Sequence, residues 1–556
     1  MTTPADLVVT NARVITMDDE TPRAEAVAIS GNRIVAVGSD EEIAALAGPD
    51  TRRLDAGGQT VLPGFNEAHM HLFTGAAELP HLHLHGVHGF EALSRAVTDY
   101  ATAHPDERLL IGQSADYTIL SDSEPVTRHH LDRILPDRPF IMYAPDHHTA
   151  WANTAALEAG GILKGRDVGV GSEIVMGEDG LAAGELREPP AIMPVARLSE
   201  TGGRERLGLD TGGEPDPAPS PAERERDLQV LRDGLAYCAR HGITSIQNMD
   251  GNLYLLELLE ELHRQGELKA RVRVPLHMKN FTPLEDLEKA VAWRERFADD
   301  MLRSDFVKVF MDGVLDSWTA VMLDDYADRP GWKGEPLFQQ EHFDRLATEA
   351  DRRGLQIAVH AIGDGAVRMV LDGYEAVREA NGNRDSRHRI EHIEVVHPDD
   401  VSRLGSLGVV ASVQPVHPPG SAGLPLQPTV SRIGEAKWPY AYAWKTLKDG
   451  GARMVFATDW PVSPIDPMHA IREALNRKPW KEGLPDHRPT LHEALASYTR
   501  ESAWVEFMED RKGKLAPGYL ADLVVLSGDV EQAPVETLHE IRPVTTICDG
   551  RITYQA

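Results

Sequence analysis

Short apolar runs alternate with amphipathic segments along most of the chain. Eight of these runs are nearly continuous in apolar residues and end in polar turns, as buried parallel strands do. They span residues 61–70, 243–248, 272–278, 306–312, 355–360, 388–393, 409–414 and 453–458. From the second run onward, segments with helical periodicity fill most of the gaps, for example 253–268 and 343–354. Eight strand–helix units predict an α/β fold built as a (β/α)8 TIM barrel.

The two chain ends have a different pattern, in which β-branched runs are separated by short polar turns. These runs span residues 6–17, 24–38, 521–529 and 544–556. Neither end has enough apolar residues to make a domain by itself. We therefore expect residues 1–60 and 506–556 to pair into one small β-sandwich domain, with the barrel domain at 61–505 inserted between them.

The segment from about 73 to 230 is far longer than one loop of a barrel requires. It contains two strand-like runs, RLLIGQS (108–114) and RPFIMYAP (138–145), so we expect an inserted subdomain here. Its last part, residues 204–227, is rich in Gly and Pro and predicts a mobile connector. A second long loop, residues 414–444, follows the seventh predicted strand.

Composition narrows the class of protein. A chain of 556 residues is too long for one hydrophobic core, so two or more domains are expected. The formal net charge of -30 disfavours nucleic acid and anionic membranes as partners, because both are themselves negative. The two cysteines, Cys238 and Cys548, form no CxxC motif, which excludes a disulfide scaffold or a thiolate zinc site. No secretory signal and no run of membrane-spanning length is visible, so we expect a cytoplasmic protein.

Ionisable side chains gather at the carboxyl ends of the predicted barrel strands. In a barrel of this type those ends face one common mouth, where the chemistry takes place. Packing alone is a poor explanation for such a convergence, because buried ionisable groups are costly without partners. The residues are His69 and His71 at the end of the first strand, Lys308 in the fourth, His360 in the fifth, His392 in the sixth and Asp459 after the eighth.

The spacing of the first two residues suits a metal site. Residues two apart on a strand point the same way, so His69 and His71 face inward together. With Asp459 they are expected to hold one divalent metal. The alternative for Asp459 is a cap on the helix that follows it.

His360 and His392 are expected to hold a second metal. Two metals about 3.5–4 Å apart need a bridging ligand. A carbamate formed by CO2 on the buried amine of Lys308 would supply one, since burial among cations lowers the pKa of a lysine. The alternative for Lys308 is a plain lysine paired with Asp312 or Asp316.

Eight segments carry recognisable motifs, two of them in the insertion. They are LPGFNEAHMHL (62–72), HHTAWANTAALEAGGI (147–162), GSEIVMGEDGLAAGELREPPA (171–191), VKVFMDGVLDSWTA (307–320), VHAIGDGAV (359–367), RIEHIEVV (389–396), GARMVFATDWPVSPIDP (451–467) and GKLAPGYLADLVVLSGD (513–529). Through these segments the chain resembles the amidohydrolase superfamily from end to end. Within it, the chain is similar to the amidohydrolase 3 branch, which includes N-substituted formamide deformylases. The stretch FVKVFM (306–311) also resembles the fourth strand of hydantoinases, where that lysine is carbamylated.

The resemblance implies a distorted barrel, a composite β-sandwich made by both chain ends, and hydrolysis by a metal-bound water. It implies one or two divalent metals, with zinc expected first and manganese or iron as alternatives, and it suggests a homodimer. The opening motif has Asn66 and Glu67 where the family usually has Ile and Asp. Glu67 still keeps a carboxylate near the histidine pair.

Five further residues are candidates for binding a small-molecule substrate. Gln414 and His417 follow the seventh strand and could bind a carbonyl group, although an ordinary loop role accounts for them equally well. His148 is placed in this group by a motif of the branch. Trp318 and Trp460 are expected to line a pocket, against the alternative that they pack in the core.

We expect hydrolysis of a C–N bond, in an amide such as an N-substituted formamide or an N-acyl amine. Asp459 would take the proton from the attacking water and later deliver it to the leaving amine. His360 or His148 would help to stabilise the oxyanion. Hydrolytic deamination of an amino-heterocycle is the alternative, although no HxxE motif follows the fifth strand. A catalytically inactive barrel that acts as a binding protein is a third reading, which the intact set of six ionisable residues disfavours.

Overall fold

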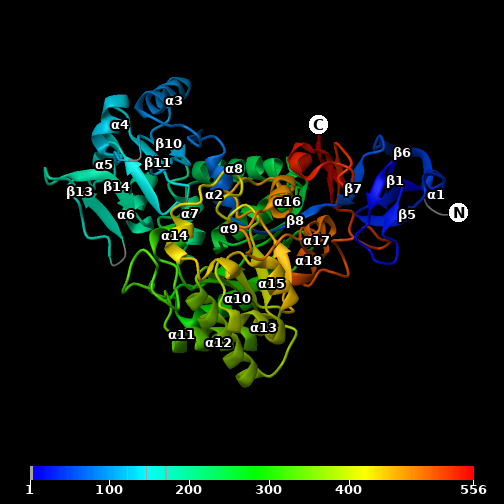
Figure 1. Ribbon diagram of the computed structural model, residues 1–556. Helices are drawn as coiled ribbons and strands as arrows, with labels where there is room; N and C mark the ends of the chain where they lie inside the picture. The colour runs from blue at the N-terminus through cyan, green and yellow to red at the C-terminus, as the bar shows by residue number, and fades with distance from the viewer. Residues whose placement is uncertain (1–3, 122, 146, 170–171) are drawn as a thin grey trace. The chain divides into compact units, whose positions relative to one another are not determined.

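The computed structural model describes residues 4–121, 123–145, 147–169 and 172–556, which divide into two units (Figure 1). Unit 1 comprises Met1–His71, Leu235–Asn252 and Leu259–Ala556, and unit 2 comprises Leu72–Gly234 and Leu253–Leu258. Two helices, α8 (Pro221–Arg240) and α9 (Leu253–Arg264), contribute residues to both units.

Two parallel sheets form the centre of unit 1. The first has the strand order β18-β16-β15-β8, and the second has the order β17-β19-β20-β21-β22-β23. The strands are β8 (Phe65–Met70), β15 (Ile243–Asn248), β16 (Arg271–Arg273), β17 (Leu276–His277), β18 (Leu302–Arg303), β19 (Phe306–Phe310), β20 (Gln356–Ala361), β21 (Arg389–His392), β22 (Val410–Val413) and β23 (Arg453–Phe456). Most of their residues are buried, which explains why these strands are so apolar in sequence.

Helices follow most of these strands and cover the sheets. In α11, the buried residues Phe343, Leu346, Ala347 and Ala350 recur at helical spacing, so one face packs against α12 and β20. The helices of unit 1 are α10 (Leu287–Arg296), α11 (Gln340–Arg352), α12 (Asp364–Asn381), α13 (Pro398–Leu407), α14 (Thr429–Ile433), α15 (Trp444–Asp449), α16 (Pro467–Asn476), α17 (Leu491–Ser497) and α18 (Arg500–Val505), besides the short α1 (Asp40–Ala44).

Six of the eight predicted strands correspond to single strands of the structure, and two were wrongly predicted as continuous. The run 61–70 is divided at Gly64 into β7 (Thr60–Pro63) and β8, which belong to different sheets. The run 272–278 is divided into β16 and β17, because Pro275 has no N–H group to donate to a ladder.

Two backbone hydrogen bonds join the end of β8 to the segment after β23. His71 N donates to the carbonyl of Trp460 at 2.8 Å, and Asp459 N donates to the carbonyl of His69 at 2.9 Å. The end of the first barrel-type strand therefore lies beside the end of the last one.

Strands from the two chain ends share one sheet. Its order is β26-β25-β24-β7-β2-β3, and β24 from the C-terminal part pairs with β7 from the N-terminal part in antiparallel fashion. A second sheet, β5-β4-β1-β6, packs on it through one apolar cluster that includes Val9, Ile29, Val61 and Val525. The strands are β1 (Ala5–Thr10), β2 (Arg13–Ile15), β3 (Arg23–Ala24), β4 (Ala26–Ser30), β5 (Arg33–Gly38), β6 (Ala47–Asp55), β24 (Leu523–Leu526), β25 (Pro543–Cys548) and β26 (Arg551–Gln555).

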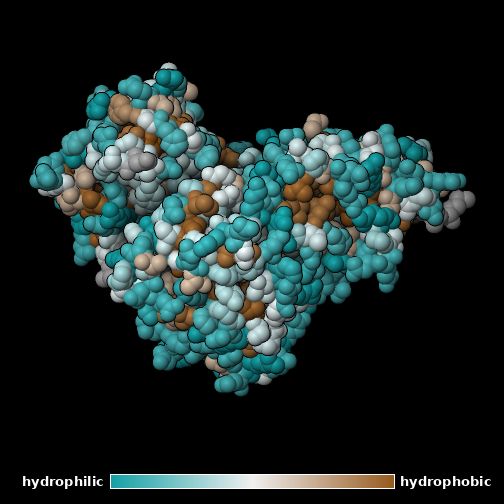
Figure 2. All heavy atoms as spheres, in the orientation of Figure 1, coloured by the Kyte–Doolittle hydropathy of each residue, from teal (hydrophilic) through white to brown (hydrophobic). Residues whose placement is uncertain are grey.

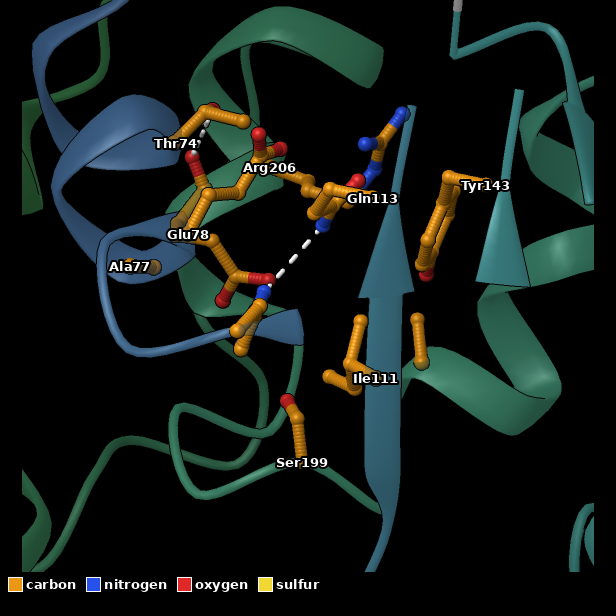
Figure 3. Close-up of a pocket in the computed structure, with 11 residues that line it drawn as sticks. Thr74, Ala77, Glu78, Ile111, Gln113, Tyr143, Ser199 and Arg206 are labelled. Atoms are coloured by element: carbon orange, nitrogen blue, oxygen red, sulfur yellow. Dashed lines mark hydrogen bonds between the residues drawn. The ribbon is translucent and has the colours of Figure 1, made fainter. Parts of the chain in front are cut away.

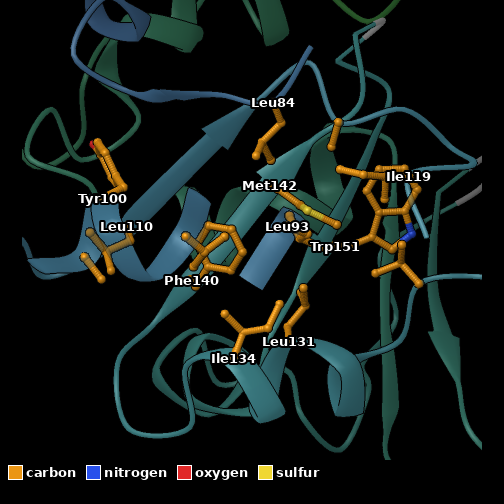
Figure 4. Packing of buried hydrophobic residues seen from close by; sticks show 14 of the residues in the cluster. Leu84, Leu93, Tyr100, Leu110, Ile119, Leu131, Ile134, Phe140, Met142 and Trp151 are labelled. Carbon is orange, nitrogen blue, oxygen red and sulfur yellow. The ribbon is translucent and has the colours of Figure 1, made fainter. Parts of the chain in front are cut away.

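Unit 2 is built on a sheet with the order β13-β14-β12-β11-β10-β9. In the central strand β11, Phe140 and Met142 point into one apolar cluster, together with α3 and α4 (Figure 4). Ile141 and Tyr143 point into a cluster on the opposite face, with α5 and α6. The elements are α2 (Leu72–Glu78), β9 (Leu82–His83), α3 (Phe90–Ala103), β10 (Leu110–Gln113), α4 (Arg128–Ile134), β11 (Phe140–Tyr143), β12 (Thr149–Ala152), α5 (Thr154–Ala159), β13 (Glu173–Met176), β14 (Ala182–Arg187), α6 (Pro189–Ala196) and α7 (Arg204–Asp210).

The segment 204–227, predicted as a mobile connector, is helical over more than half of its length. Its two ends are helical, in α7 and in the first turns of α8, and only residues 211–220 lie outside a helix. The buried guanidinium of Arg204 donates to both carboxylate oxygens of Asp227, at 2.6 and 2.9 Å, which ties the two helices together. The Gly and Pro content indicates the non-helical residues between α7 and α8, but it does not reveal this ion pair.

Hydrophilic residues cover most of the molecular face in Figure 2, in line with the large excess of acidic side chains. Within the described ranges, the helices are all too short or too polar to cross a membrane.

Gly64 offers a test of the junction between the two kinds of sheet. A Cβ atom at this position would lie 2.2 Å from Cγ2 and Oγ1 of Thr244 in β15. We expect Gly64→Ala to lower the free energy of unfolding by about 1–3 kcal/mol, because the packed strands must shift. Thermal unfolding of the variant measures this. Gly528→Ala is the control, since its Cβ would meet only ordinary contacts at 3.4 Å; equal stability of the two variants would contradict the close approach.

Candidate metal centre

One carboxylate oxygen faces two imidazole nitrogens at the strand ends of unit 1. His69 Nε2 and His71 Nε2 each lie 3.2 Å from Oδ1 of Asp459. All three side chains are buried, and their ligand atoms lie within 4.8 Å of one another. The backbone hydrogen bonds between β8 and the segment after β23 fix this spacing. Asp459 does not cap a helix, because the next helix, α16, begins at Pro467 and is capped by Asp466.

Two further carboxylates hold the imidazole rings from behind. His69 Nδ1 lies 2.7 Å from Oε2 of Glu391, and His71 Nδ1 lies 3.2 Å from Oδ1 of Asp250. A carboxylate at Nδ1 keeps the proton there and leaves Nε2 as the ligand atom. Both rings therefore direct their Nε2 atoms toward Asp459.

The charges of this group fit a divalent cation. Oδ1 of Asp459 has no hydrogen-bond partner among the described residues, although it is buried. Burial alone would lower the pKa of His71, but the hydrogen bond to Asp250 and the negative charges of Asp250 and Asp459 raise it to about 9. Without a metal, a proton thus supplies the positive charge between these two carboxylates. Two imidazole nitrogens and a carboxylate are a usual ligand set for zinc, and binding would displace that proton.

Lys308 lies in the middle of β19 and is fully buried. Its Nζ has no hydrogen-bond partner in the described part of the chain. The alternative of a pair with Asp312 or Asp316 is not seen, because the Asp312 carboxylate accepts the backbone N–H groups of Val321, Ile362 and Gly363, and Asp316 accepts from the hydroxyl of Thr429. Burial lowers the pKa of Lys308 to about 8, against the opposing charges of Glu391 and Asp459. A neutral amine is therefore accessible near neutral pH.

His360 and His392 lie next to each other at the ends of β20 and β21, with ring centres 4.4 Å apart. His360 Nε2 lies 3.0 Å from the carbonyl oxygen of Gly313, and His392 Nδ1 lies 2.9 Å from Oε1 of Gln414. Burial and the charge of Lys308 lower the pKa of His360 to about 3. Both rings are neutral as a result, with one nitrogen anchored and the other available.

His417 joins this group from the loop after β22. Its ring stacks on that of His392 with centres 5.9 Å apart, and its Nε2 lies 3.8 Å from Oδ2 of Asp459. On the other side, its Nδ1 lies 3.6 Å from Oε1 of Glu394. The ligand atoms of His392, His417 and Asp459 also lie within 4.8 Å of one another.

The remaining predicted site residues lie in different surroundings. The carbonyl of Trp460 accepts the hydrogen bond from His71 N, and the Trp460 ring is buried near Tyr237. Trp318 packs under the guanidinium of Arg432, and its Nε1 donates to Oδ1 of Asp328 at 3.0 Å. His148 belongs to unit 2, where its Nδ1 lies 2.9 Å from Oε2 of Glu188.

Glu67, at the position where the motif departs from the usual pattern, is buried beside the histidine pair. Its Oε1 accepts the backbone N–H of Thr458 at 2.6 Å. Burial raises the pKa of Glu67 to about 8, so its carboxyl group is largely protonated at neutral pH. This residue links β8 to the segment after β23 and is absent from both groups of ligand atoms.

Glu391 and Asp250 were missed in the sequence. Asp250 lies two residues after the end of β15, so the rule that selected the other strand-end residues would have found it. Glu391 gave a weaker signal, since it lies inside a buried strand next to a histidine. Burial would raise the pKa of Glu391, but the adjacent charge of Arg389 holds it well below the usual value. Arg389 also donates to Gln247, Ser412 and the carbonyl of Ala68.

A sequence profile of the amidohydrolase family matches residues 52–554. The chain belongs to the amidohydrolase family. It is 30% identical over 539 residues to the protein LONG AFTER FAR-RED 3 of Arabidopsis thaliana, covering 94% of this chain and 87% of the relative. It is 26% identical over 575 residues to the N-substituted formamide deformylase of Arthrobacter pascens, covering 100% of this chain and 99% of the relative.

The fold of this amidohydrolase is also similar to a solved structure. A crystal structure of a metal-dependent hydrolase from Pyrococcus horikoshii superimposes with a TM-score of 0.72 at 26% identity, covering 93% of this chain and 96% of that chain. The chain is accordingly a metal-dependent hydrolase of the amidohydrolase family.

The carboxylate behind His69 gives a test of the metal centre. We expect Glu391→Gln to weaken metal binding by about 10- to 100-fold, because the amide no longer fixes the imidazole. Competition with a coloured chelator measures the affinity. Glu341→Gln, at an exposed position of α11, is the matched control. Unchanged affinity in a folded Glu391→Gln protein would show that Glu391 does not support a metal ligand.

Proposed function

We propose that this amidohydrolase cleaves an amide-type C–N bond in a small organic molecule, such as an N-substituted formamide or an N-acyl amine. The observation that carries the proposal is the shared oxygen of Asp459, which faces His69 Nε2 and His71 Nε2 at equal distances of 3.2 Å. The similarity to the N-substituted formamide deformylase of Arthrobacter pascens supports the choice of bond.

The proposed ligands form two sets. His69, His71 and Asp459 hold one divalent metal, with zinc favoured by the nitrogen-rich donor set. His360 and His392 hold a second, together with a carbamate made when the neutral amine of Lys308 adds to CO2 and releases a proton. When bound, such metals polarise a substrate carbonyl and lower the pKa of water.

Asp459 is the proposed proton carrier. Its Oδ1 faces the two histidines, while its Oδ2 is directed toward His417 at 3.8 Å. The carboxylate takes one proton from the attacking water and gives it to the nitrogen of the leaving amine as the C–N bond breaks. The same group thus acts as general base and then as general acid.

Two side chains after β22 are proposed to bind the substrate oxygen. Gln414 Nε2 and His417 Nε2 are buried nitrogens without a hydrogen-bond partner in the described ranges. Each is fixed at its other end, Gln414 by His392 and His417 by Glu394. Preorganised donors of this kind stabilise a developing oxyanion. His360 is assigned to ligation, since its Nε2 is already bonded to the carbonyl of Gly313.

We further propose that the two parallel sheets of unit 1 together make the distorted (β/α)8 barrel. The hydrogen bonds from the end of β8 to the segment after β23 support closure at one end. In this proposal the barrel domain covers residues 61–505 with an inserted subdomain at about 73–230, and the β-sandwich domain combines 1–60 and 506–556. The catalytic groups then lie at the carboxyl ends of the barrel strands.

A hydrolysis screen tests the proposed reaction. N-substituted formamides, N-acyl amines, cyclic amides and amino-heterocycles are supplied to the purified protein, and released amine, acid and ammonia are measured. We expect amine and acid from at least one amide class, and no turnover after removal of metal by a chelator. Ammonia release from amino-heterocycles alone would make the protein a deaminase instead. Full activity without metal would refute the mechanism.

Asp459→Asn separates binding from proton transfer. We expect the variant to keep most of its metal, because the amide oxygen remains a ligand, and to lose about 100- to 10,000-fold in turnover. Metal analysis and amine release are measured on the same sample. Asp449→Asn, at an exposed position at the end of α15, is the control. Turnover close to that of the unaltered protein would exclude Asp459 as the proton carrier.

Lys308→Ala tests the carbamate. We expect loss of metal or of more than about 100-fold in activity, since a missing ligand costs several kcal/mol of stabilisation. Formate, acetate and propionate should restore part of the activity, because a free carboxylate can take the place of the carbamate. An unaffected variant would refute a bridging role for Lys308.

A further inference from the structure

Unit 2 contains a small polar cavity of its own (Figure 3). It has room for about one or two water-sized groups. Its walls include Glu78, Gln113, Glu205 and Arg206, beside the ring of Tyr143. Most of these polar side chains are more than nine-tenths buried, which is uncommon unless they have a ligand or dense hydrogen bonding.

Three elements bring these side chains together. In the buried helix α2, Thr74, Ala77 and Glu78 line the cavity from one helical face. In the strand β10, Ile111 and Gln113 point to the same side because they are two residues apart. The helix α7 adds Glu205 and Arg206.

The charges around the cavity are unbalanced in favour of the carboxylates. Arg206 is the cation in its wall, and its Nε lies 3.3 Å from Oδ2 of Asp210. Glu78 and Glu205 are then two further carboxylates, and His147 Nδ1 lies 3.4 Å from the first of them. Burial raises the pKa of Glu205, and a cation in the cavity would favour its charged form. An anion is therefore a poor ligand here, since Arg206 already has its counter-charge.

Two buried oxygens in the wall have no donor. Gln113 is 4% exposed, and its Nε2 lies 3.1 Å from Nδ1 of His81, which burial keeps neutral by lowering its pKa to about 3. The other end of this amide, Oε1, has no hydrogen-bond partner among the described residues, and the same holds for the buried Oε2 of Glu205. Each unmatched buried acceptor costs about 1–3 kcal/mol.

A ligand for this cavity must be small, positively charged and able to donate several hydrogen bonds. We propose that the cavity of unit 2 binds an ammonium-type cation, either ammonium itself or the head of a small primary ammonium such as methylammonium. Its N–H groups donate to Oε1 of Gln113 and to Oε2 of Glu205, and its charge is balanced by the carboxylates. The site is separate from the metal ligands and does not rest on the proposed hydrolysis.

The metal-loaded full-length protein is titrated with four chlorides at constant ionic strength, and binding is followed by calorimetry and thermal unfolding. Ammonium and methylammonium should bind with one-to-one stoichiometry and raise the unfolding temperature. Potassium has the charge but no N–H group, and tetramethylammonium has neither N–H groups nor a small head. Equal binding of potassium or tetramethylammonium would overturn the assignment, as would the absence of saturable binding, which leaves water as the occupant.

Variants locate the site. Glu205→Gln keeps the shape but removes a charge, and should weaken ammonium binding about tenfold, the loss of one charged hydrogen bond. Gln113→Glu adds a charge and should strengthen it. Glu91→Gln, at an exposed position of α3, is the control and should change nothing.

The Glu205→Gln variant also distinguishes this site from ammonia bound at the metal centre, because the substitution would not change binding there. Binding that is unchanged in folded Glu205→Gln and Gln113→Glu proteins would refute the site. If Glu205→Gln fails to fold, two tests remain. The unaltered protein must bind ammonium more tightly than potassium, and Gln113→Glu must bind ammonium more tightly than the unaltered protein.

Discussion

The site depends on one contact, in which a single oxygen of Asp459 faces the Nε2 atoms of His69 and His71. All three atoms are electron donors, so their approach to 3.2 Å requires a positive charge among them. The approach is imposed by the backbone, because the N–H groups of His71 and Asp459 bond to carbonyls of the opposite segment. The same backbone pairing that joins the two segments therefore brings the three side chains of the candidate metal site together.

A second layer of charge makes this contact specific. Arg389 keeps Glu391 ionised in a fully buried position, and Glu391 in turn fixes His69. A buried ion pair of this kind adds little stability by itself, since desolvation offsets most of the attraction. Its effect is on orientation, because a histidine bonded at Nδ1 can ligate only through Nε2. The negative charge of Glu391 also raises the pKa of Lys308, whereas burial lowers it. As a result, the amine of Lys308 is close to the balance between its charged and neutral forms at neutral pH.

The sequence predicted the parts of the fold that depend on local pattern. Parallel strands are apolar along their whole length, so six of them were recognised, and polar residues at their ends selected His360 and His392. The features that the sequence did not predict depend on contacts between residues that are distant in sequence. The division at Gly64 follows from the pairing of β7 with β24, far along the chain. The role of Glu391 follows from contact with His69, 322 positions away, and no local pattern reveals such a pair.

Buried acceptors without a hydrogen-bond donor occur both in the candidate metal centre and in the cavity of unit 2, but the two sets differ in the type of acceptor atom. At Asp459 the acceptors include imidazole nitrogens, which suit a transition metal such as zinc. Around Gln113 and Glu205 they are amide and carboxylate oxygens, and the described residues of the cavity supply no cluster with the spacing of metal ligands. An oxygen acceptor outside such a cluster is better matched by an N–H group, which reaches it at about 2.9 Å, than by a metal that several ligands must hold near 2 Å. The kind of acceptor thus favours a metal at the first group and an ammonium-type cation at the second.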